Sequence, residues 1–184
     1  MEKLTIGQGL RRIKKLKGLL SEAQSRAGQS TSWVEGKDPV FNFEEQRKLR
    51  SEHRDEVVRL ETAIARANAV TQIEVGERKL YLAGAIREIQ ELKGDLAWLA
   101  TLNLRAGVEE TTEYVYDEVK ERNLPKTKSV TYKAVMSEPD RVKEVQNLRD
   151  QLERLNDAVE TANHRTLIEV EPPPQKAESS PAAA

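Results

Sequence analysis

Two pairs of polar residues recur in the two halves of this sequence and are its best candidates for binding chemistry. Asn68 and Thr71 reappear ninety-five positions later as Asn163 and Thr166. An amide and a hydroxyl three residues apart, each supplied twice, would offer several hydrogen-bonding groups to one polar ligand. The basic side chains beside them are Arg66, His164 and Arg165. We therefore predict a polar ligand-binding cluster, and the alternative interpretation is helix capping and turn formation.

Matched cations form a second candidate site for an anion. Arg11 and Lys17 return seventy-six positions later as Arg87 and Lys93, and such pairs across a twofold axis could clamp an anionic ligand. Solvated helix faces explain them equally well. The run RRIKKLK, residues 11–17, lies in a segment with seven cations and two acids, a net charge of +5 over residues 1–27. It is compatible with a solvated face, an oligomer contact or an anion site.

Motifs for catalysis, nucleotide binding and metal binding are missing from the sequence. Gly7-Gln-Gly9 comes before a helix without the preceding strand of a phosphate-binding loop. His53 and His164 do not have zinc-ligand spacing, and there is no cysteine. We therefore predict a protein that is not an enzyme and has no metal and no cofactor. A hydrolase that uses scattered carboxylates is the alternative.

The sequence is a tandem duplication. Residues 54–75 align without gaps on 149–170 with eleven identities in 22 positions, and residues 3–20 align on 79–96. The offsets of 95 and 76 place 19 additional residues in the second copy. Each copy therefore reads as helix, connection, helix and short closing segment.

Apolar residues three or four apart predict four helices, two in each copy. The second runs from about residue 44 to 68, and the fourth begins after Ser137 with Pro139 in its first turn. We predict an all-α fold: a four-helix bundle made of two tandem αα-hairpins with pseudo-twofold symmetry, in a single domain of residues 1–170. The repeats are predicted at about 2–75 and 77–170.

Two glycines occupy equivalent positions in the middle of predicted helices. Gly18 and Gly94 each cost about 1 kcal/mol relative to alanine. Close helix contact near the pseudo-twofold axis, or room for a ligand, would account for them. His53 aligns with Leu148, so we predict that it lies in the interior or at its boundary.

The connecting segments have weaker signals. Residues 71–75 and 166–170 alternate in the manner of strands, and we expect them to lie beside one another after helices that end at Asn68 and Asn163. Residues 28–43 suit a small hairpin or an ordered loop. A protruding β-arm is predicted at about 111–136, with the turn at KERNLPKT, and a disordered tail at 171–184.

Composition limits the partners. Charged residues make up 33% of the chain, but its net charge is −1, so no overall field favours nucleic acid or membrane surfaces. No apolar run approaches the roughly 20 residues of a membrane span. We predict a cytoplasmic protein that binds no specific nucleic acid.

The arrangement resembles the septicolysin-like family of small helical bacterial proteins of unknown function. The resemblance rests on KLTIGQGLRRIKKLKGLL, on ARANAVTQI followed by KLYLAGAIREIQELKGDL, and on SVTYKAVM before ETANHRTLI. His164 departs from the family pattern, which has tryptophan there. The resemblance implies a helical, oligomeric protein without an established enzyme activity.

These observations favour a non-catalytic homo-oligomer that acts by binding or assembly. The alternative is a sponge that sequesters a small anionic ligand such as a signalling nucleotide, as a phage counter-defence protein would. A membrane-active protein is less favoured, because nothing in these residues supports lysis.

Overall fold

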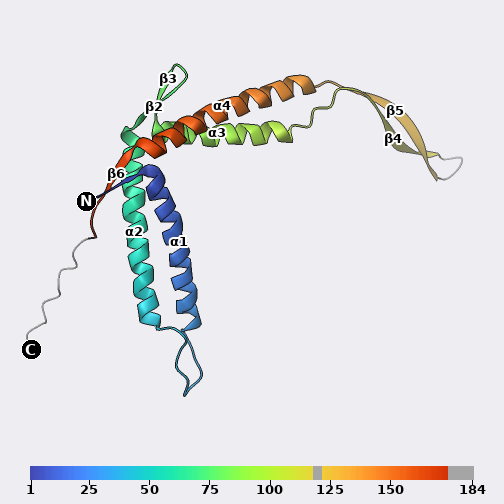
Figure 1. Cartoon of the computed structure of the whole chain (residues 1–184). Helices are drawn as coiled ribbons and strands as arrows, with labels where there is room; N and C mark the ends of the chain where they lie inside the picture. Colours follow the sequence, from blue (N-terminus) through green and yellow to red (C-terminus); the bar gives the residue numbers. More distant parts are fainter. Residues whose placement is uncertain (118–121, 174–184) are drawn as a thin grey trace, which may run out of the picture. The chain divides into compact units, whose positions relative to one another are not determined.

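The computed structural model describes residues 1–117 and 122–173, which form two compact units. Unit 1 contains Met1–Arg87 and the chain from Leu155 onward, and unit 2 is Glu88–Arg154. The element order is β1 (Glu2–Thr5), α1 (Ile6–Gln29), α2 (Phe43–Val70), β2 (Gln72–Val75), β3 (Arg78–Tyr81), α3 (Leu82–Thr101), β4 (Gly107–Asp117), β5 (Arg122–Tyr132), α4 (Glu138–Arg165) and β6 (Leu167–Val170) (Figure 1). Helices α3 and α4 each run from one unit into the other.

Helices α1 and α2 form a hairpin in unit 1 (Figure 1). The Thr5 amide donates to the Gln8 side-chain oxygen and the Thr5 hydroxyl accepts from the Gln8 amide, a capping box that starts α1. The apolar stripes of the two helices face one another, which leaves Ile13, Leu16, Ala23, Val57, Leu60, Ala63 and Ile64 buried. A hydrogen bond joins the two ends of the connecting loop, because the buried Ser30 hydroxyl accepts from the Phe41 amide at 3.2 Å.

Two short strand pairs in unit 1 have the same geometry. β2 pairs antiparallel with β3, and Ile73 lies opposite Leu80. β6 pairs antiparallel with β1, and Ile168 lies opposite Leu4. The registers correspond under the sequence offsets of 95 and 76 positions. The closing strand of each repeat therefore pairs with a strand that opens a repeat: β2 with the next one in the chain, and β6 with the first.

Two of the best-buried residues of unit 1 lie where strands lead into helices. Ile6 and Leu82, the first residues of α1 and α3, are 1% and 0% exposed. Gly9 packs so closely that a Cβ atom there would lie 3.0 Å from Cδ1 of Ile168. The core therefore ties the β1–β6 pair to the α1–α2 hairpin.

Unit 2 contains the greater parts of α3 and α4 and the β4–β5 ribbon. Arg141 at the start of α4 donates to the Leu99 carbonyl near the end of α3 at 3.3 Å. The Ser137 hydroxyl accepts from the Asp140 amide, which caps α4 as predicted. The ribbon pairs Gly107 with Tyr132 at its base and continues for eleven residues in each strand.

The predicted all-α four-helix bundle is wrong. The described chain contains six strands in three two-stranded sheets, which makes the fold a mixture of helix and strand. The predicted closing strands exist, but they do not pair with one another. Residues 3–5 and 79–81, where we predicted no strand, are strands that satisfy the closing strands' backbone groups.

Several local predictions also need correction. The second helix continues to Val70, so Asn68 and Asn163 lie inside α2 and α4 rather than ending them. A Cβ at Gly18 or Gly94 would meet nothing within 4 Å, which contradicts close helix contact. The segment around Pro125 is strand rather than turn.

Other local predictions agree with the structure. The arm lies at 107–132, against about 111–136 predicted. Residues 30–42 form a loop without strands, where a small hairpin or an ordered loop was predicted, and His53 is half-buried. Residues 174–184 of the predicted disordered tail lie outside the described residues. None of the helices in residues 1–117 and 122–173 combines the length and apolar character needed to cross a bilayer.

Candidate binding site

Two threonines stand where a helix gives way to a strand in unit 1. The Thr71 amide donates to the Ala67 carbonyl at 2.9 Å, and its carbonyl accepts from the Leu82 amide at 2.8 Å. Thr166 makes the same two bonds, with Ala162 at 2.8 Å and Ile6 at 3.0 Å. Each threonine therefore ends one helix and connects to the start of another, which fixes the backbone around the predicted cluster.

A groove between α4 and β2 contains three of the predicted site residues. We call it the α4/β2 groove, and its volume is about 480 Å³. It is lined by Thr71, Gln72, Ile73, Glu74, Asp157, Ala158, Thr161, Ala162, Arg165 and Thr166. Three threonine hydroxyls, one guanidinium and two carboxylates thus line one open hollow. Such a lining can bind a ligand through hydroxyl hydrogen bonds and one charge-assisted contact from Arg165.

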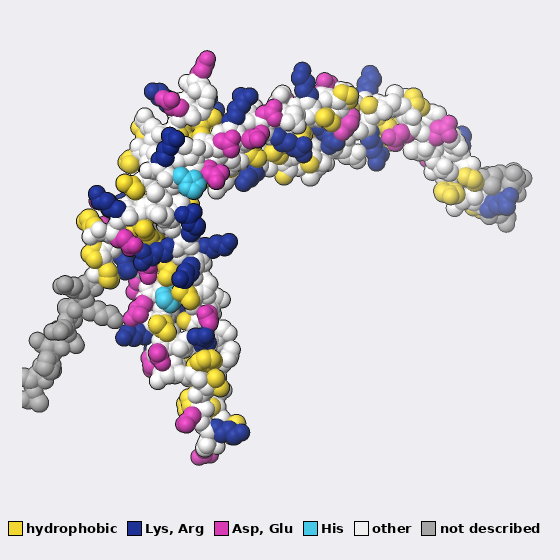
Figure 2. Space-filling model, viewed as in Figure 1, with side chains coloured by type: hydrophobic (Ala, Val, Ile, Leu, Met, Phe, Trp, Pro, Cys, Tyr) yellow, Lys and Arg dark blue, Asp and Glu magenta, His cyan; other side chains and the backbone are white. Residues whose placement is uncertain are grey.

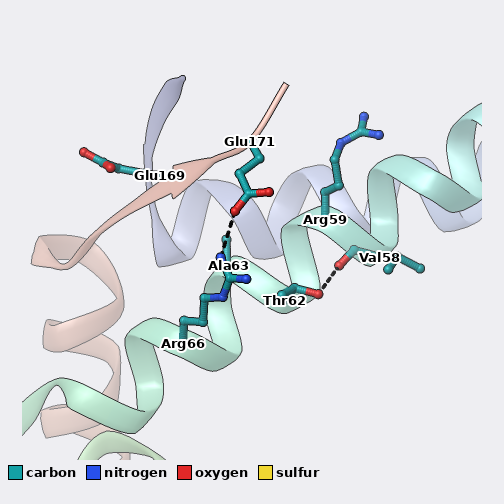
Figure 3. A pocket seen from close by; sticks show the side chains of 7 residues that line it. All are labelled: Val58, Arg59, Thr62, Ala63, Arg66, Glu169 and Glu171. Carbon is teal, nitrogen blue, oxygen red and sulfur yellow. Dashed lines mark hydrogen bonds and ion pairs between the residues drawn. The ribbon is translucent and has the colours of Figure 1, made fainter. Parts of the chain in front are cut away.

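The other repeat forms an equivalent but smaller groove between α2 and β6. The α2/β6 groove has a volume of about 150 Å³ and includes Ala63 and Glu169, which align with Ala158 and Glu74 of the first groove. Figure 3 shows Arg66 meeting Glu171, and these side chains form an ion pair at 2.9 Å. The Thr62 hydroxyl donates to the Val58 carbonyl at 2.8 Å (Figure 3). The Arg66, Glu171 and Thr62 side chains of the α2/β6 groove therefore already have partners within the chain.

Beside the α2/β6 groove lies a hollow of about 350 Å³, which we call the Arg12 hollow. Arg12 donates to both carboxylate oxygens of Glu2 at 2.8 and 2.7 Å and contacts Glu56 at 2.5 Å. The hydrogen bond to Glu2, followed by that to Glu56, raises the pKa of the Arg12 guanidinium. This network joins β1 to both helices of the hairpin.

Arg59 lines both the α2/β6 groove and the Arg12 hollow and was missed by sequence reasoning. Its Nε atom is buried and has no hydrogen-bond partner among the described residues. Figure 3 shows its guanidinium projecting from α2, separate from the Arg66–Glu171 pair. The signal available in the sequence was its identity with Arg154 in the aligned repeats.

The predicted polar cluster is only partly assembled. Thr71, Arg165 and Thr166 share the α4/β2 groove, whereas Arg66 belongs to the α2/β6 groove. His164 is exposed and lies 3.8 Å from Glu160. The asparagines line neither groove, and Oδ1 of Asn68 is buried without a hydrogen-bond partner in the described chain.

The cations of the predicted clamp come from two helices, α1 and α3. Lys17 forms an ion pair with Glu61 at 2.8 Å in unit 1. Arg11 is exposed on α1, and Arg87 and Lys93 are exposed on α3. Charged side chains of both signs are interspersed along the helices in Figure 2. Within residues 1–117 and 122–173, no three His, Asp or Glu side chains gather closely enough to hold a metal ion.

Comparison with known proteins gives a structural relative. No family model matches the chain, and no curated protein matches it. A similar solved structure is the crystal structure of a functionally unknown conserved protein from Corynebacterium diphtheriae. The likeness has a TM-score of 0.68 at 17% sequence identity and covers 91% of this chain and 100% of that chain. This likeness shows a shared fold.

Proposed function

We propose that this protein is a non-catalytic homo-oligomer of the cytoplasm that acts by binding or assembly. The observation that carries the proposal is the β4–β5 ribbon. None of its side chains that the structure describes is buried, although each strand has eleven residues. Tyr114 and Tyr116 are 71% and 59% exposed. Figure 2 shows hydrophobic side chains at the surface of this ribbon.

The low stability expected of an isolated two-stranded ribbon supports an assembly role. A two-stranded ribbon is marginally stable in water by itself and needs a third strand or a packed face. Its open edges also present unpaired backbone groups to other chains. A second protein molecule that covers the ribbon would supply the missing contacts. The absence of cysteine suits a reducing compartment.

Oligomeric state at increasing concentration tests this proposal. Light scattering coupled to size-exclusion chromatography, from about 5 μM to about 500 μM, should show a mass above that of one chain. A chain that stays monomeric over the whole range refutes the proposal.

Removal of the ribbon provides the matched variant. Gly107 and Tyr132 are directly paired, so their Cα atoms lie about 5 Å apart and a short Gly-Ser linker can replace residues 107–132. We expect this variant to remain helical by circular dichroism and to lose the oligomer. If the variant forms the same oligomer, the interface lies outside the ribbon, and the exposed ribbon no longer supports the proposal.

The α4/β2 groove favours a second candidate, sequestration of a small anionic ligand. Its volume of about 480 Å³ lies in the range typical of small-molecule sites. Arg165 would pair with the anion, and the hydroxyls of Thr71 and Thr166 would fix its orientation. The nearby Glu74 and Asp157 favour ligands that also carry hydrogen-bond donors, such as nucleotides with an exocyclic amine.

Thermal shifts with mono-, di- and cyclic nucleotides, and with inorganic phosphate, test this second candidate. A stabilising ligand should lose its effect in Arg165→Gln. Arg66→Gln is the control, because Arg66 lines the smaller α2/β6 groove and already pairs with Glu171. No stabilisation by any nucleotide removes the candidate, and equal losses in both variants would show that the contact is non-specific.

A further inference from the structure

We infer that the α4/β2 groove binds a small zwitterion, with the anionic group of the ligand at Arg165 and its cationic group at Asp157. This inference goes beyond the second candidate function, because it concerns the same groove but assigns it a different class of ligand. All the residues that line the groove belong to unit 1. The α2/β6 groove, formed by the other repeat, provides an internal comparison.

The chain places its own guanidinium and carboxylate in the α2/β6 groove. Arg66 and Glu171 both line this groove and pair with each other at 2.9 Å (Figure 3). The groove has a volume of about 150 Å³. The aligned positions of the other repeat hold Thr161 and Gly76, which supply neither charge. The α4/β2 groove, with Thr161 in its lining, therefore lacks this ion pair, and its volume is about 480 Å³.

Three aligned positions, four residues apart, give the two grooves different charge patterns. In α2 these positions hold Thr62, Arg66 and Val70, and in α4 they hold Asp157, Thr161 and Arg165. Residues four apart are neighbours on one face of a helix. The α4/β2 groove thus has an acid at one end, a base at the other end and a short hydroxyl side chain between them.

Of the three charged side chains that line the α4/β2 groove, Glu74 alone has an ion-pair partner in the described chain. It pairs with Lys79, its cross-strand neighbour, at 3.2 Å. The side chains of Asp157 and Arg165 form no ion pair and no hydrogen bond among the described residues. These two side chains are therefore the charges of the groove that remain for a ligand.

The distance between Asp157 and Arg165 sets the length of the ligand. Eight residues at about 1.5 Å each separate them by about 12 Å along α4, whereas charged side chains on a helix pair at spacings of three or four residues. A charge-assisted contact at each end takes up about 2.8 Å. A ligand that bridges the two side chains therefore needs its opposite charges roughly 6 Å apart.

Ligands with charge of one sign suit this groove less well. A simple anion would pair with Arg165 and be repelled by Asp157, and a simple amine would pair with Asp157 and be repelled by Arg165. A zwitterion of the right length satisfies both ends, and the threonine hydroxyls of the groove can bind polar groups between them. δ-Aminovalerate, an ω-amino acid, and free L-lysine belong to this class.

δ-Aminovalerate and three analogues test the ligand class on the unmodified protein. Pentylamine lacks the carboxylate, valerate lacks the ammonium group, and glycine has both charges too close together. In an NMR titration of isotope-labelled protein, δ-aminovalerate should shift the backbone amides of the groove. Its dissociation constant should be roughly millimolar, because exposed ion pairs are individually weak. Each analogue should bind at least about fivefold more weakly.

Substitutions connect each charge of the ligand with one side chain. Asp157→Asn should bind δ-aminovalerate and valerate equally, because the ammonium group no longer meets a carboxylate. Arg165→Gln should likewise bind δ-aminovalerate and pentylamine equally. Glu160→Gln is the matched control, because Glu160 is an acid of α4 that does not line the groove, and it should bind as the wild type does. Thr161→Arg supplies the guanidinium that α2 has in Arg66 and should block binding. Circular dichroism checks that these variants fold.

The possible failures separate this inference from the second candidate function. Equal binding of δ-aminovalerate and valerate by the wild type would overturn the zwitterion and leave sequestration of an anion intact. Stabilisation by nucleotides or phosphate, with no binding of δ-aminovalerate or L-lysine, would have the same meaning. Binding of neither class would remove both claims. Binding of δ-aminovalerate that persists unchanged in Thr161→Arg would place the ligand outside the groove and overturn the inference.

Discussion

Two glycines on helix α1 should respond in opposite ways to the same substitution. Gly18 is exposed, and a Cβ atom there would meet nothing within 4 Å. Alanine should therefore recover the helix propensity that glycine forgoes, about 0.8–1 kcal/mol. Gly9 is buried, and its Cβ would lie 3.0 Å from Cδ1 of Ile168 and 3.3 Å from Cδ1 of Ile64.

The magnitude at Gly9 follows from these distances. Carbon atoms in good contact are about 3.5–4.0 Å apart, so the added methyl overlaps Ile168 by roughly 0.5–1 Å. Overpacking of this kind typically costs about 1–3 kcal/mol, against a propensity gain of about 1 kcal/mol. Gly9→Ala should therefore leave stability unchanged or lower it by up to about 2 kcal/mol. The aligned residue Ala85 is fully buried, which shows that the second repeat accepts a methyl group there.

Urea and thermal unfolding, followed by circular dichroism at low protein concentration, measure the difference. Gly18→Ala should raise the unfolding midpoint by roughly 2–4 °C, and Gly9→Ala should not. The two variants should differ by at least about 1 kcal/mol in the free energy of unfolding. A Gly18→Ala variant that is less stable than the wild type would refute the reasoning. That result would mean that the surface at Gly18 is packed against another molecule.

Three further perturbations follow from individual contacts. Arg12→Gln should lower the free energy of unfolding by about 1 kcal/mol or less. The loss should be smaller in high salt, because salt screens these partly exposed ion pairs. Equal losses at low and high salt would contradict this expectation. Ser30→Ala should cost about 1–3 kcal/mol in urea unfolding, since it removes the acceptor of the buried loop contact with Phe41. Hydrogen bonds from Ser137 lower the pKa of Asp140 in the folded protein. The ionised carboxylate therefore contributes fully to folding stability above its unfolded pKa of about 3.9, and this contribution is lost as pH falls through the lower folded pKa. Asp140→Asn should remove that part of the acid dependence of stability, measured by unfolding between about pH 2 and 6.

The candidate site was only partly accessible from the sequence. Alignment of the repeats identified Thr71 and Thr166, and the α4/β2 groove brings them together with Arg165. The same alignment could not show that Arg66 lies outside this groove, because Arg66 pairs with Glu171, a residue 105 positions away. Arg59 was missed because an arginine in a polar helix reads as a solvated side chain. Arg59 lines the Arg12 hollow together with Glu2 of β1 and Val170 of β6, which lie far away in the sequence.

The sequence by itself determined the four helices, the closing strands and the arm, because helical spacing, caps and alternation are local properties. Tertiary structure alone decided the pairing of β2 with β3 and of β6 with β1. Four-residue strands are too short for periodicity to distinguish them from the first turn of a helix, and backbone hydrogen bonding carries no information about which distant strand will supply the partner. An apolar stripe likewise indicates that a helix face must be buried. Because the hydrophobic effect is non-directional, the stripe does not determine which element covers that face.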